Sequence, residues 1–405
     1  MSTGPGREGP TVTVPHRHRL TELEATVGSP YGLDPLADPL PPPSGASLRG
    51  ALESRLLEAL RRPPCLVPFS GGRDSSTVLA LADSLARAEG LPAPIPITHR
   101  FPGVEETEET EWQEMLVARL GSTDWVKLTW TDELDIIGPY AARVLRRHGQ
   151  VMPFNAHFLS PMAERARGGS LLTGIGGDEL FGPVDRRVLA ALLFSRRRPR
   201  RSELTKLAAE LAPARIRIAR ASAKHPFQAF SWLRPDARAF LAKEFARTYA
   251  MPLRWDASID LMWRTRYVQC SRSTLAALGG DHGARVSAPF LDPALLSDFA
   301  AVAGARGLGK RESSLPALVG DLLPPELLDR RTKSTFDSVF FNRHARAFAR
   351  AWDGAGLDHN LVDPEALRSE WSRERPNPNT FSLLQMAWRK QDRAEAPGPQ
   401  ASASA

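Results

Sequence analysis

Residues 66–77 read Leu66-Val-Pro-Phe-Ser-Gly-Gly-Arg-Asp-Ser-Ser-Thr77, and this stretch decides the fold. An apolar run leads into Ser70-Gly-Gly-Arg-Asp-Ser-Ser76, and a helical pattern over Thr77–Glu89 follows directly. This order predicts a strand, a glycine-rich turn and the first turn of a helix. Glycine lets the backbone approach an anion closely, and the N–H groups and dipole at a helix N-terminus favour phosphate there.

The turn is not a Walker loop, because it lacks the G-x-x-x-x-G-K-[ST] spacing and the lysine of that motif. Its pattern S-G-G-x-D-S resembles the PP-loop of ATP pyrophosphatases. That resemblance implies a loop that holds the pyrophosphate released when ATP is converted to AMP. An ordinary glycine-rich turn is the alternative, and the full string after an apolar strand argues against it.

Strand-like and helix-like segments alternate on both sides of this turn. Leu48, Leu52, Leu56 and Leu60 recur every four residues behind Ser47, which predicts a helix before the first strand. Such alternation predicts an α/β fold with a doubly wound, mainly parallel sheet, whose ligands bind at the carboxyl ends of strands at a topological switch point. The further expected strands are 94–101, 125–130 and 170–174, and the expected helices are 105–120, 133–148, 155–167, 189–195, 203–211, 237–249 and 256–277.

Composition shifts divide the chain into four expected parts. Residues 1–46 are expected to be poorly structured and to end in the proline-rich linker Pro41–Gly45. Residues 47–185 are expected to form the nucleotide-binding α/β core, and residues 186–390 a mostly helical part that completes the active site. Residues 391–405 are expected to be a disordered tail.

The composition excludes several classes of protein. The chain has 405 residues, of which 42% are hydrophobic and 24% charged, so a large buried core is feasible. It contains no apolar run of membrane-spanning length and no N-terminal signal pattern. Its two cysteines, Cys65 and Cys270, are too few for a disulfide framework. We therefore expect a cytoplasmic protein without a membrane partner.

The net charge of +7 permits a polyanionic partner. Part of it is concentrated in Arg196-Arg-Arg-Pro-Arg-Arg201, but no aromatic residues interleave this run, as a single-strand binding platform requires. A solvated arginine loop is therefore favoured over a nucleic-acid site. A surface for an acidic peptide or partner protein is a third option.

A second glycine-rich stretch, Thr173-Gly-Ile-Gly-Gly-Asp-Glu-Leu-Phe-Gly182, follows the fourth expected strand. Alone it is a weak signal that an ordinary tight turn also explains. Paired with the first stretch it is more specific, because Asp74 and Asp178 each follow the end of an expected parallel strand. If those strands are neighbours, both carboxylates face one nucleotide. Mg²⁺ prefers carboxylate oxygens together with phosphate oxygens.

At this point the chain resembles the synthetase domain of asparagine synthetases and their relatives, the β-lactam synthetases and lasso peptide cyclases. The resemblance covers roughly residues 48–390. It implies a reaction class in which a carboxylate attacks the α-phosphate of ATP, pyrophosphate leaves, and an amine then displaces AMP to form an amide. Four stretches carry it in the order typical of the family: 70–76, 173–182, Arg285-Val-Ser-Ala-Pro-Phe-Leu-Asp292, and Leu322-Leu-Pro-Pro-Glu-Leu-Leu-Asp-Arg-Arg-Thr-Lys-Ser-Thr-Phe336.

The resemblance also implies roles for individual residues, with ATP and Mg²⁺ as cofactors. Asp74 and Asp178 would bind Mg²⁺, and Lys333 would stabilise the negative charge that develops as the adenylate forms and collapses. A solvated loop lysine is the alternative for Lys333. Arg285 and Asp292 are interpreted as a structural brace. The pyrophosphate would be held by Ser70, Gly71, Gly72, Ser75 and Ser76, and the nucleotide would contact Thr173, Gly174, Phe69 and the Thr98–His99 region.

Two departures from the family pattern bear on the amine. Glutamine-dependent members carry a catalytic cysteine after Met1, whereas residue 2 here is Ser2, so we expect no glutaminase domain. Asparagine synthetases have an acidic residue where this chain has Ile175, which neither accepts nor holds a proton. Glu179 and His282 are the candidates to replace that base, and none is needed if the amine arrives neutral.

The leading hypothesis is an ATP-dependent, AMP-forming amide synthetase without its own glutaminase domain, in specialised-metabolite or peptide biosynthesis. Its expected partners are a small-molecule or peptide carboxylate, an amine or ammonia, and a separate ammonia-supplying or substrate-delivering protein. Ammonia-dependent asparagine synthesis is the first alternative. A PP-loop enzyme acting on tRNA, suggested by the basic charge, and a non-catalytic partner protein, suggested by Ile175, are the others.

Overall fold

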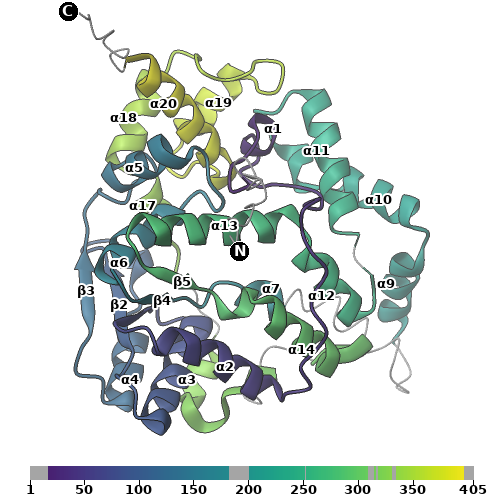
Figure 1. Ribbon diagram of the computed structural model, residues 1–405. Coiled ribbons are helices and arrows are strands. Elements are labelled where there is room, and N and C mark those ends of the chain that lie inside the picture. The colour runs from purple at the N-terminus through teal and green to yellow at the C-terminus, as the bar shows by residue number, and fades with distance from the viewer. Residues whose placement is uncertain are drawn as a thin grey trace, which may run out of the picture.

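Five parallel strands form one sheet in the order β3-β2-β1-β4-β5 (Figure 1). The structure, a computed structural model, describes residues 17–181, 200–250, 252–308, 314–315, 318–330 and 334–395. The predicted α/β fold with a parallel sheet is confirmed. The strands are β1 (Cys65–Pro68), β2 (Ile95–Arg100), β3 (Val126–Thr129), β4 (Ser170–Leu172) and β5 (Arg285–Ser287).

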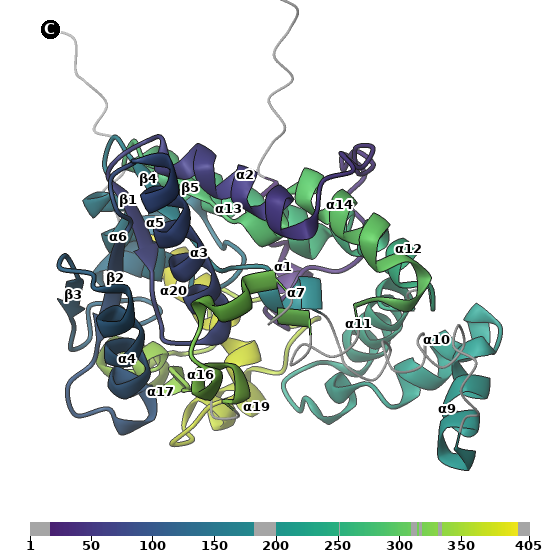
Figure 2. The same cartoon turned by 90° about the horizontal axis from the view of Figure 1, so that it is seen from below.

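Helices cover both faces of this sheet because its central strands are apolar on both sides. Val67 of β1 joins a core with Val78 and other side chains of the helices on one face, whereas Leu66 joins a separate core with Met162 on the opposite face. Figure 2 shows the sheet and these helices edge-on. The first layer contains α2 (Leu48–Leu60), α3 (Arg73–Glu89) and α4 (Thr110–Leu120), and the second contains α5 (Pro139–His148), α6 (Ser160–Arg165) and α13 (Arg266–Asp281).

Most of the described residues beyond the sheet and its layers are helical, as expected. Trp232, Trp352 and Trp371 are buried in a core of their own, away from the sheet. Helices α9 (Arg201–Leu211) and α10 (Ala214–Ala223) project at the side of the molecule opposite β3 (Figures 1 and 2). The other helices are α7 (Gly177–Phe181), α11 (Pro235–Thr248), α12 (Trp255–Trp263), α14 (Pro293–Ala303), α16 (Pro325–Asp329), α17 (Asp337–Phe340), α18 (Arg343–Ala351), α19 (Pro364–Trp371) and α20 (Phe381–Glu395).

Several element boundaries differ from the predictions for local reasons. The expected helix 256–277 is two helices, because Thr265 ends the first and caps α13 by accepting a hydrogen bond from the N–H of Val268. The expected helix 133–148 begins only at Pro139, which suits the first helical position. The expected helix 155–167 is a 3-10 turn, Ala156–Leu159, followed by α6. β5 was not predicted as a strand.

Residues 17–34 differ from the expected poorly structured segment, because they contain a short helix and buried side chains, whereas residues 38–46 have no helix or strand and are mostly exposed. Short helix α1 (Glu22–Ala25) begins with a capping box between Thr21 and Glu24. The Glu24 carboxylate is buried and forms an ion pair with Arg266 at 2.6 Å, which holds the segment against α13. At the other end α20 runs to Glu395, into the expected tail. The expected helix 189–195 and residues 196–199 of the arginine run lie outside the described residues.

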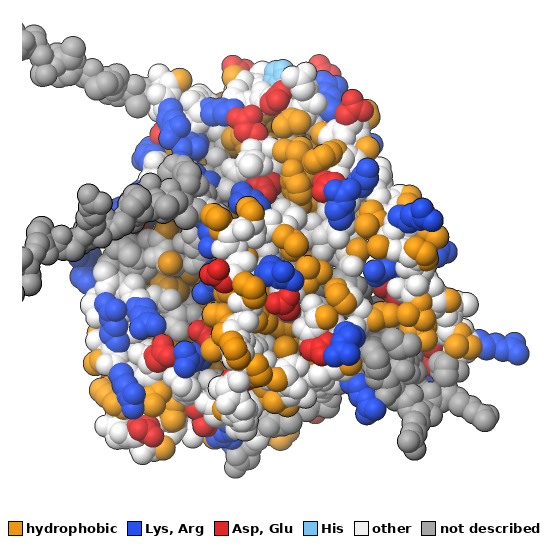
Figure 3. Space-filling view, turned by 45° about the vertical axis from the view of Figure 1, so that its right-hand side comes forward, with side chains coloured by type: hydrophobic (Ala, Val, Ile, Leu, Met, Phe, Trp, Pro, Cys, Tyr) orange, Lys and Arg blue, Asp and Glu red, His pale blue; other side chains and the backbone are white. Residues whose placement is uncertain are grey.

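The two cysteines do not form a disulfide, and the surface carries charged and hydrophobic side chains side by side. Cys65 and Cys270 are both free and buried, and burial raises the pKa of each thiol to about 12. On the face shown in Figure 3, basic and acidic side chains are interspersed with hydrophobic ones. Within the described ranges, none of the helices is both long and apolar enough to cross a lipid bilayer.

Candidate active site

A cavity of about 630 Å³ opens at the carboxyl ends of β1, β2 and β4. This is the edge of a doubly wound sheet at which ligands bind, and the volume suits a nucleotide-sized molecule. Gly71, Ser76 and Glu179 do not line the cavity. Nine of the predicted site residues do line it: Phe69, Ser70, Gly72, Asp74, Ser75, Thr98, Thr173, Gly174 and Asp178.

The two glycine-rich stretches meet in this cavity because β1 and β4 are neighbouring parallel strands, with Cys65 paired to Ser170. The contact is so close that only glycine fits at two positions. A Cβ on Gly177 would stand 2.3 Å from Cγ of Asp74, and a Cβ on Gly174 would stand 2.9 Å from the backbone carbonyl carbon of Asp74. Asp74 and Asp178 therefore line the same cavity.

The first glycine-rich turn presents the beginning of α3 to the cavity. Gly72 is the N-cap residue of this helix, and no side chain caps its first turn. The hydroxyl groups of Ser70 and Ser75 lie 3.1 Å apart, and the Ser75 hydroxyl donates to the carbonyl oxygen of Gly72 at 3.0 Å. Ser76 is fully buried within α3. The turn thus has the N–H donors that an anion requires.

A brace that the sequence did not reveal holds the glycine-rich turn from behind. Buried Arg330 donates to the carbonyl oxygen of Gly71 at 3.1 Å, forms an ion pair with buried Glu109, and lies with its guanidinium 5.0 Å from the ring centre of Trp112. Gln113 donates from its amide nitrogen to the carbonyl oxygen of Ser70 at 3.1 Å. Arg330 lies within the family stretch Leu322–Phe336, which is the one sequence signal near it.

Lys333, the predicted charge-stabilising residue, lies outside the described residues. Its nearest described neighbours on either side, Arg330 and Ser334, both line the cavity. Both also bind Glu109, to which the backbone N–H of Ser334 donates at 3.0 Å. The described residues on both sides of Lys333 therefore lie in the wall of the cavity.

The corner formed by Phe69, Thr98 and His99 is uncharged. The Trp130 indole N–H donates to Nδ1 of His99 at 2.7 Å, so Nε2 carries the proton and donates to the carbonyl oxygen of Phe158 at 2.9 Å. Burial lowers the pKa of His99 to about 4, which keeps the ring neutral. The Thr98 hydroxyl donates to the carbonyl oxygen of Phe69 at 2.8 Å. Apolar side chains complete this wall: Phe158, Leu159, Met162, Phe336 and Phe340.

Glu179, the other predicted catalytic residue, lies behind Ile175. Ile175 lines both the large cavity and a second one of about 40 Å³, which Glu179 and Tyr267 also line. Burial raises the pKa of the Glu179 carboxyl, and the charges of Asp178 and Asp74 raise it further. Tyr267, which the sequence did not single out, forms a side-chain hydrogen bond with Glu179, and burial raises the pKa of its hydroxyl.

Three further residues of the sequence analysis lie outside the large cavity. His282 is the C-cap residue of α13 and lines neither of these two cavities. Arg285 forms an ion pair with Glu58 at 3.2 Å. Asp292 caps α14, because its carboxylate accepts from the backbone N–H groups of Ala294 and Leu295. These contacts are structural.

The acidic residues of the cavity fit Mg²⁺ better than a metal that needs an all-protein cage. Among the described side chains, no group of three or more His, Cys, Asp or Glu residues is arranged to hold a metal ion. Mg²⁺ needs only one or two carboxylates besides water and substrate phosphates. Asp74 and Asp178 supply two, and the charges of both raise the pKa of Glu179, as expected where negative charge is concentrated. These two residues would hold the ion.

Comparison with known proteins agrees with this geometry. The family model for asparagine synthase matches residues 46–393, which is most of the chain and includes every residue that lines the large cavity. A search of curated proteins finds no match. Members of this family are ATP-dependent enzymes that form carbon–nitrogen bonds. The chain therefore belongs to the asparagine synthase family.

Proposed function

We propose that this enzyme adenylates a carboxylate with ATP and transfers the acyl group to an amine or to ammonia, forming an amide and releasing AMP and pyrophosphate. One observation carries the proposal. Asp74 packs against the backbone of the second glycine-rich stretch, directly before Asp178, in the cavity onto which α3 opens. N–H donors for a pyrophosphate and carboxylates for Mg²⁺ thus surround one volume.

We assign the first step to residues of this cavity and to Lys333. The first turn of α3, with Ser70, Gly72 and Ser75, binds the β- and γ-phosphates. A carboxylate oxygen of the acyl substrate attacks the α-phosphorus, and the bond to the bridging oxygen breaks as pyrophosphate leaves. Mg²⁺, held by Asp74 and Asp178, would neutralise charge on the phosphates. Lys333 stabilises the negative charge that develops on the phosphorus centre and on the acyl oxygen.

The second step needs an amine in its neutral form. Nitrogen attacks the acyl carbon, the bond from carbon to the AMP oxygen breaks, and the nitrogen loses one proton. Ile175 cannot accept that proton. We infer that the amine enters as the free base and that water takes the released proton, so that neither Glu179 nor His282 acts as the base.

The acyl substrate that we propose is larger and less charged than free aspartate. The wall beside the neutral His99 ring is apolar, with Phe158 and Phe340 ring centres 4.8 Å apart. Among the described residues, the cations that line the cavity are Arg73 and Arg330, and Arg330 already pairs with Glu109. Such a wall suits an apolar acyl group or part of a peptide. Ammonia-dependent asparagine synthesis remains the second candidate, because the family match favours it.

One experiment separates these functions. Purified protein is incubated with Mg²⁺, ATP and hydroxylamine, together with a panel of carboxylates from aspartate to short peptides. AMP, pyrophosphate and the acyl hydroxamate are measured. Formation of all three with a peptide or apolar acid supports the proposal, whereas activity with aspartate makes the chain an asparagine synthetase. No AMP with any acid, together with no ATP binding, would favour a non-catalytic partner protein.

Two further parts of the proposal concern the setting of the reaction. Free ammonia, a separate ammonia-supplying protein or an amine on the substrate itself supplies the nitrogen, and the acyl substrate arrives free or on a substrate-delivering protein. The requirement for ATP and the two free thiols suit the cytoplasm. RNA binding with a steep salt dependence would instead favour an enzyme acting on tRNA.

A further inference from the structure

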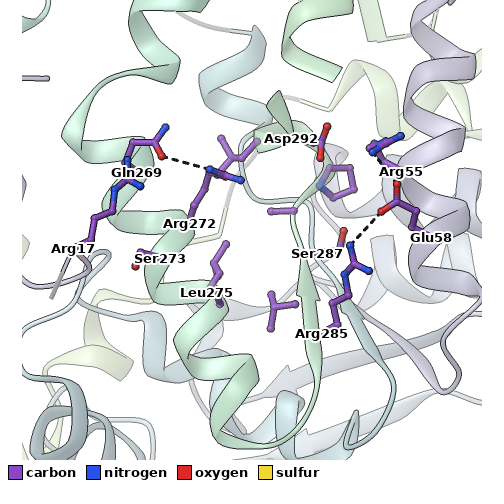
Figure 4. A pocket seen from close by; sticks show the side chains of 15 residues that line it. Arg17, Arg55, Glu58, Gln269, Arg272, Ser273, Leu275, Arg285, Ser287 and Asp292 are labelled. Atoms are coloured by element: carbon purple, nitrogen blue, oxygen red, sulfur yellow. Dashed lines mark hydrogen bonds and ion pairs between the residues drawn. The ribbon is translucent and has the colours of Figure 1, made fainter. Parts of the chain in front are cut away.

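A separate cavity of about 380 Å³ lies at the open edge of the sheet beside β5 (Figure 4). It shares no lining residue with the large cavity. Helix α2 borders it on one side and α13 on the other, and the turn that follows β5 closes it. Its lining has a net charge of +2, from Arg17, Arg55, Arg272 and Arg285 against Glu58 and Asp292.

On one wall of this edge cavity, the positive charges are partly neutralised by a carboxylate of the same wall. Glu58 lies between two arginines, with ion pairs to Arg55 at 2.8 Å and to Arg285 at 3.2 Å. Figure 4 shows these three side chains together on the side of α2. Both arginines there share this one carboxylate, just as Arg17 on the opposite wall pairs with Asp34, whereas the guanidinium of Arg272 is held by an aromatic ring and an amide.

The opposite wall holds two cations in fixed positions. The guanidinium of Arg272 lies 4.4 Å from the ring centre of Trp263, and its Nη1 donates to Gln269 at 3.4 Å. Arg17 donates from Nε to Asp34 at 2.6 Å, while its Nη2 is buried and has no hydrogen-bond partner. Stacking and pairing therefore orient both side chains without using all their N–H donors.

The charge of Arg17 also disfavours the charged form of Arg272. Burial lowers the pKa of Arg272, and although the nearby charge of Asp292 acts in the opposite direction, the charge of Arg17 lowers it further. Asp292 is itself engaged by two backbone N–H groups of α14. An anion placed between the two guanidinium groups would relieve their repulsion and satisfy the buried donor of Arg17.

We propose that the edge cavity binds an oxyanion, a phosphate or carboxylate group carried by a small molecule, between Arg17 and Arg272. Guanidinium groups bind both kinds of oxyanion through paired N–H donors, and the fixed orientation of these two lowers the entropic cost of binding. The volume leaves room beside the anionic group for the rest of a small polar molecule. The hydroxyl groups of Ser273 and Ser287, which also line the cavity, are available to it.

Calorimetry on the full chain with inorganic phosphate and with succinate tests the proposal and separates the two sources. We expect at least one probe to bind at millimolar concentration. Arg272→Gln and Arg17→Gln should each weaken that binding by about tenfold or more, because each removes charge-assisted hydrogen bonds. Arg143→Gln is the matched control: Arg143 is an exposed arginine paired with Glu164, and binding should not change.

Two further variants distinguish binding at the edge cavity from binding at the glycine-rich turn. Ser273→Asp adds a competing carboxylate to the edge cavity and should abolish binding while both arginines remain, with folding checked by thermal unfolding. Ser75→Ala reports on phosphate held by the glycine-rich turn instead. Phosphate binding that is lost in Ser75→Ala but kept in Arg272→Gln overturns the proposal, and so does the absence of binding by both probes.

Discussion

The carboxylate of Asp74 lies against the α-carbon of Gly177, so closely that a Cβ at position 177 would stand 2.3 Å from Asp74 Cγ. The two residues belong to different glycine-rich stretches on neighbouring strands. Their contact places Asp74 beside the backbone that leads directly into Asp178. Glycine is required at this position because a second main chain approaches it, not because of a left-handed backbone conformation.

This contact predicts that Gly177→Ala displaces Asp74 and weakens binding of Mg²⁺. The atoms that the added methyl group would meet belong to the Asp74 carboxylate, so this side chain has to turn away, and it is the proposed metal ligand. We expect the Mg²⁺ concentration needed for half-maximal AMP release to rise at least about tenfold. A Mg²⁺ titration of pyrophosphate release measures this.

The matched control for that variant is Gly280→Ala in α13. A Cβ there meets no atom within 4 Å, so the substitution should leave turnover unchanged and stabilise the helix by roughly 0.5–1 kcal/mol. Equal loss of activity in both variants would show that the effect at Gly177 is not a local one.

Asp74→Asn and Asp178→Asn test the metal assignment directly. Each removes one carboxylate from the proposed Mg²⁺ site with little change in shape, so we expect turnover to fall at least about a hundredfold while the fold is kept. Glu89→Gln, at the exposed end of the same α3, is the control and should have no effect. Normal turnover in either aspartate variant would refute the assignment.

From the ion pair of Arg330 with Glu109, we predict that Arg330 acts by positioning the glycine-rich turn. Arg330→Lys keeps the charge but loses the planar fork that reaches both Gly71 and Glu109, so the KM for ATP should rise and the protein should lose stability. Steady-state kinetics and urea unfolding measure the two effects. Arg375→Lys, in an exposed ion pair with Glu106, should change stability by less than about 1 kcal/mol.

A double variant separates positioning from folding. Arg330→Leu alone leaves a buried carboxylate unpaired, which costs about 3–5 kcal/mol. Adding Glu109→Leu removes that carboxylate and should restore much of the stability. The turn would still lack its brace, so the KM for ATP should stay high. Recovery of the KM together with stability would mean that the pair serves only the fold.

The sequence predicts the sheet well because each central strand is a short apolar run that a turn ends. Ser70-Gly-Gly72 follows one such run and Thr173-Gly174 follows another. Parallel pairing then brings the residues after both strands to one edge of the sheet, which made the meeting of Asp74 and Asp178 predictable. β5 escaped prediction because Arg285–Ser287 has three residues and no apolar run.

The parts of the site that the sequence did not reveal depend on contacts between distant residues. Glu109 and Arg330 are 221 positions apart, and no local period links them. The aromatic wall likewise joins Phe158 to Phe336 and Phe340 across the fold. Glu179 is a predicted candidate for the base that Ile175 does not supply, but Glu179 and its neighbour Asp178 point in different directions, as consecutive residues of a helix do. Its side chain therefore faces Tyr267 instead of the large cavity.

Glu179→Gln tests whether that residue is the base. Because its side chain lies behind Ile175, we expect the variant to keep most of its turnover. The pKa of Glu179 is raised in the folded protein, so this carboxyl loses its proton at a lower pH in the unfolded chain than in the folded one. As the pH rises above the ordinary pKa of a glutamate, Glu179 therefore lowers the free energy of unfolding. Urea unfolding at pH 8 should therefore show Glu179→Gln to be more stable than the natural chain, with the advantage lost near pH 4. Complete loss of turnover would instead restore Glu179 as a base.

Two histidines with a lowered pKa predict a loss of stability in mild acid. Burial lowers the pKa of both His99 and His157 to about 4, whereas an unfolded histidine titrates near 6.5. Between these values the unfolded chain binds more protons than the folded one, so the free energy of unfolding falls as pH falls. For each histidine the loss between pH 7 and pH 5 is about 2 kcal/mol. Asp135 opposes this trend, because burial raises its pKa to about 6.

Comparing variants isolates one histidine from these opposing groups. His157 donates from Nε2 to the carbonyl oxygen of Leu134, and the amide of His157→Gln is able to replace that donor. Urea unfolding measures the free energy of unfolding at pH 7 and at pH 5. The fall in this free energy between the two pH values should be smaller by about 2 kcal/mol in His157→Gln than in the natural chain. Exposed His359→Gln serves as the control and should leave the difference as it is. An unchanged difference in His157→Gln would mean that His157 is protonated in the folded protein, which its burial opposes.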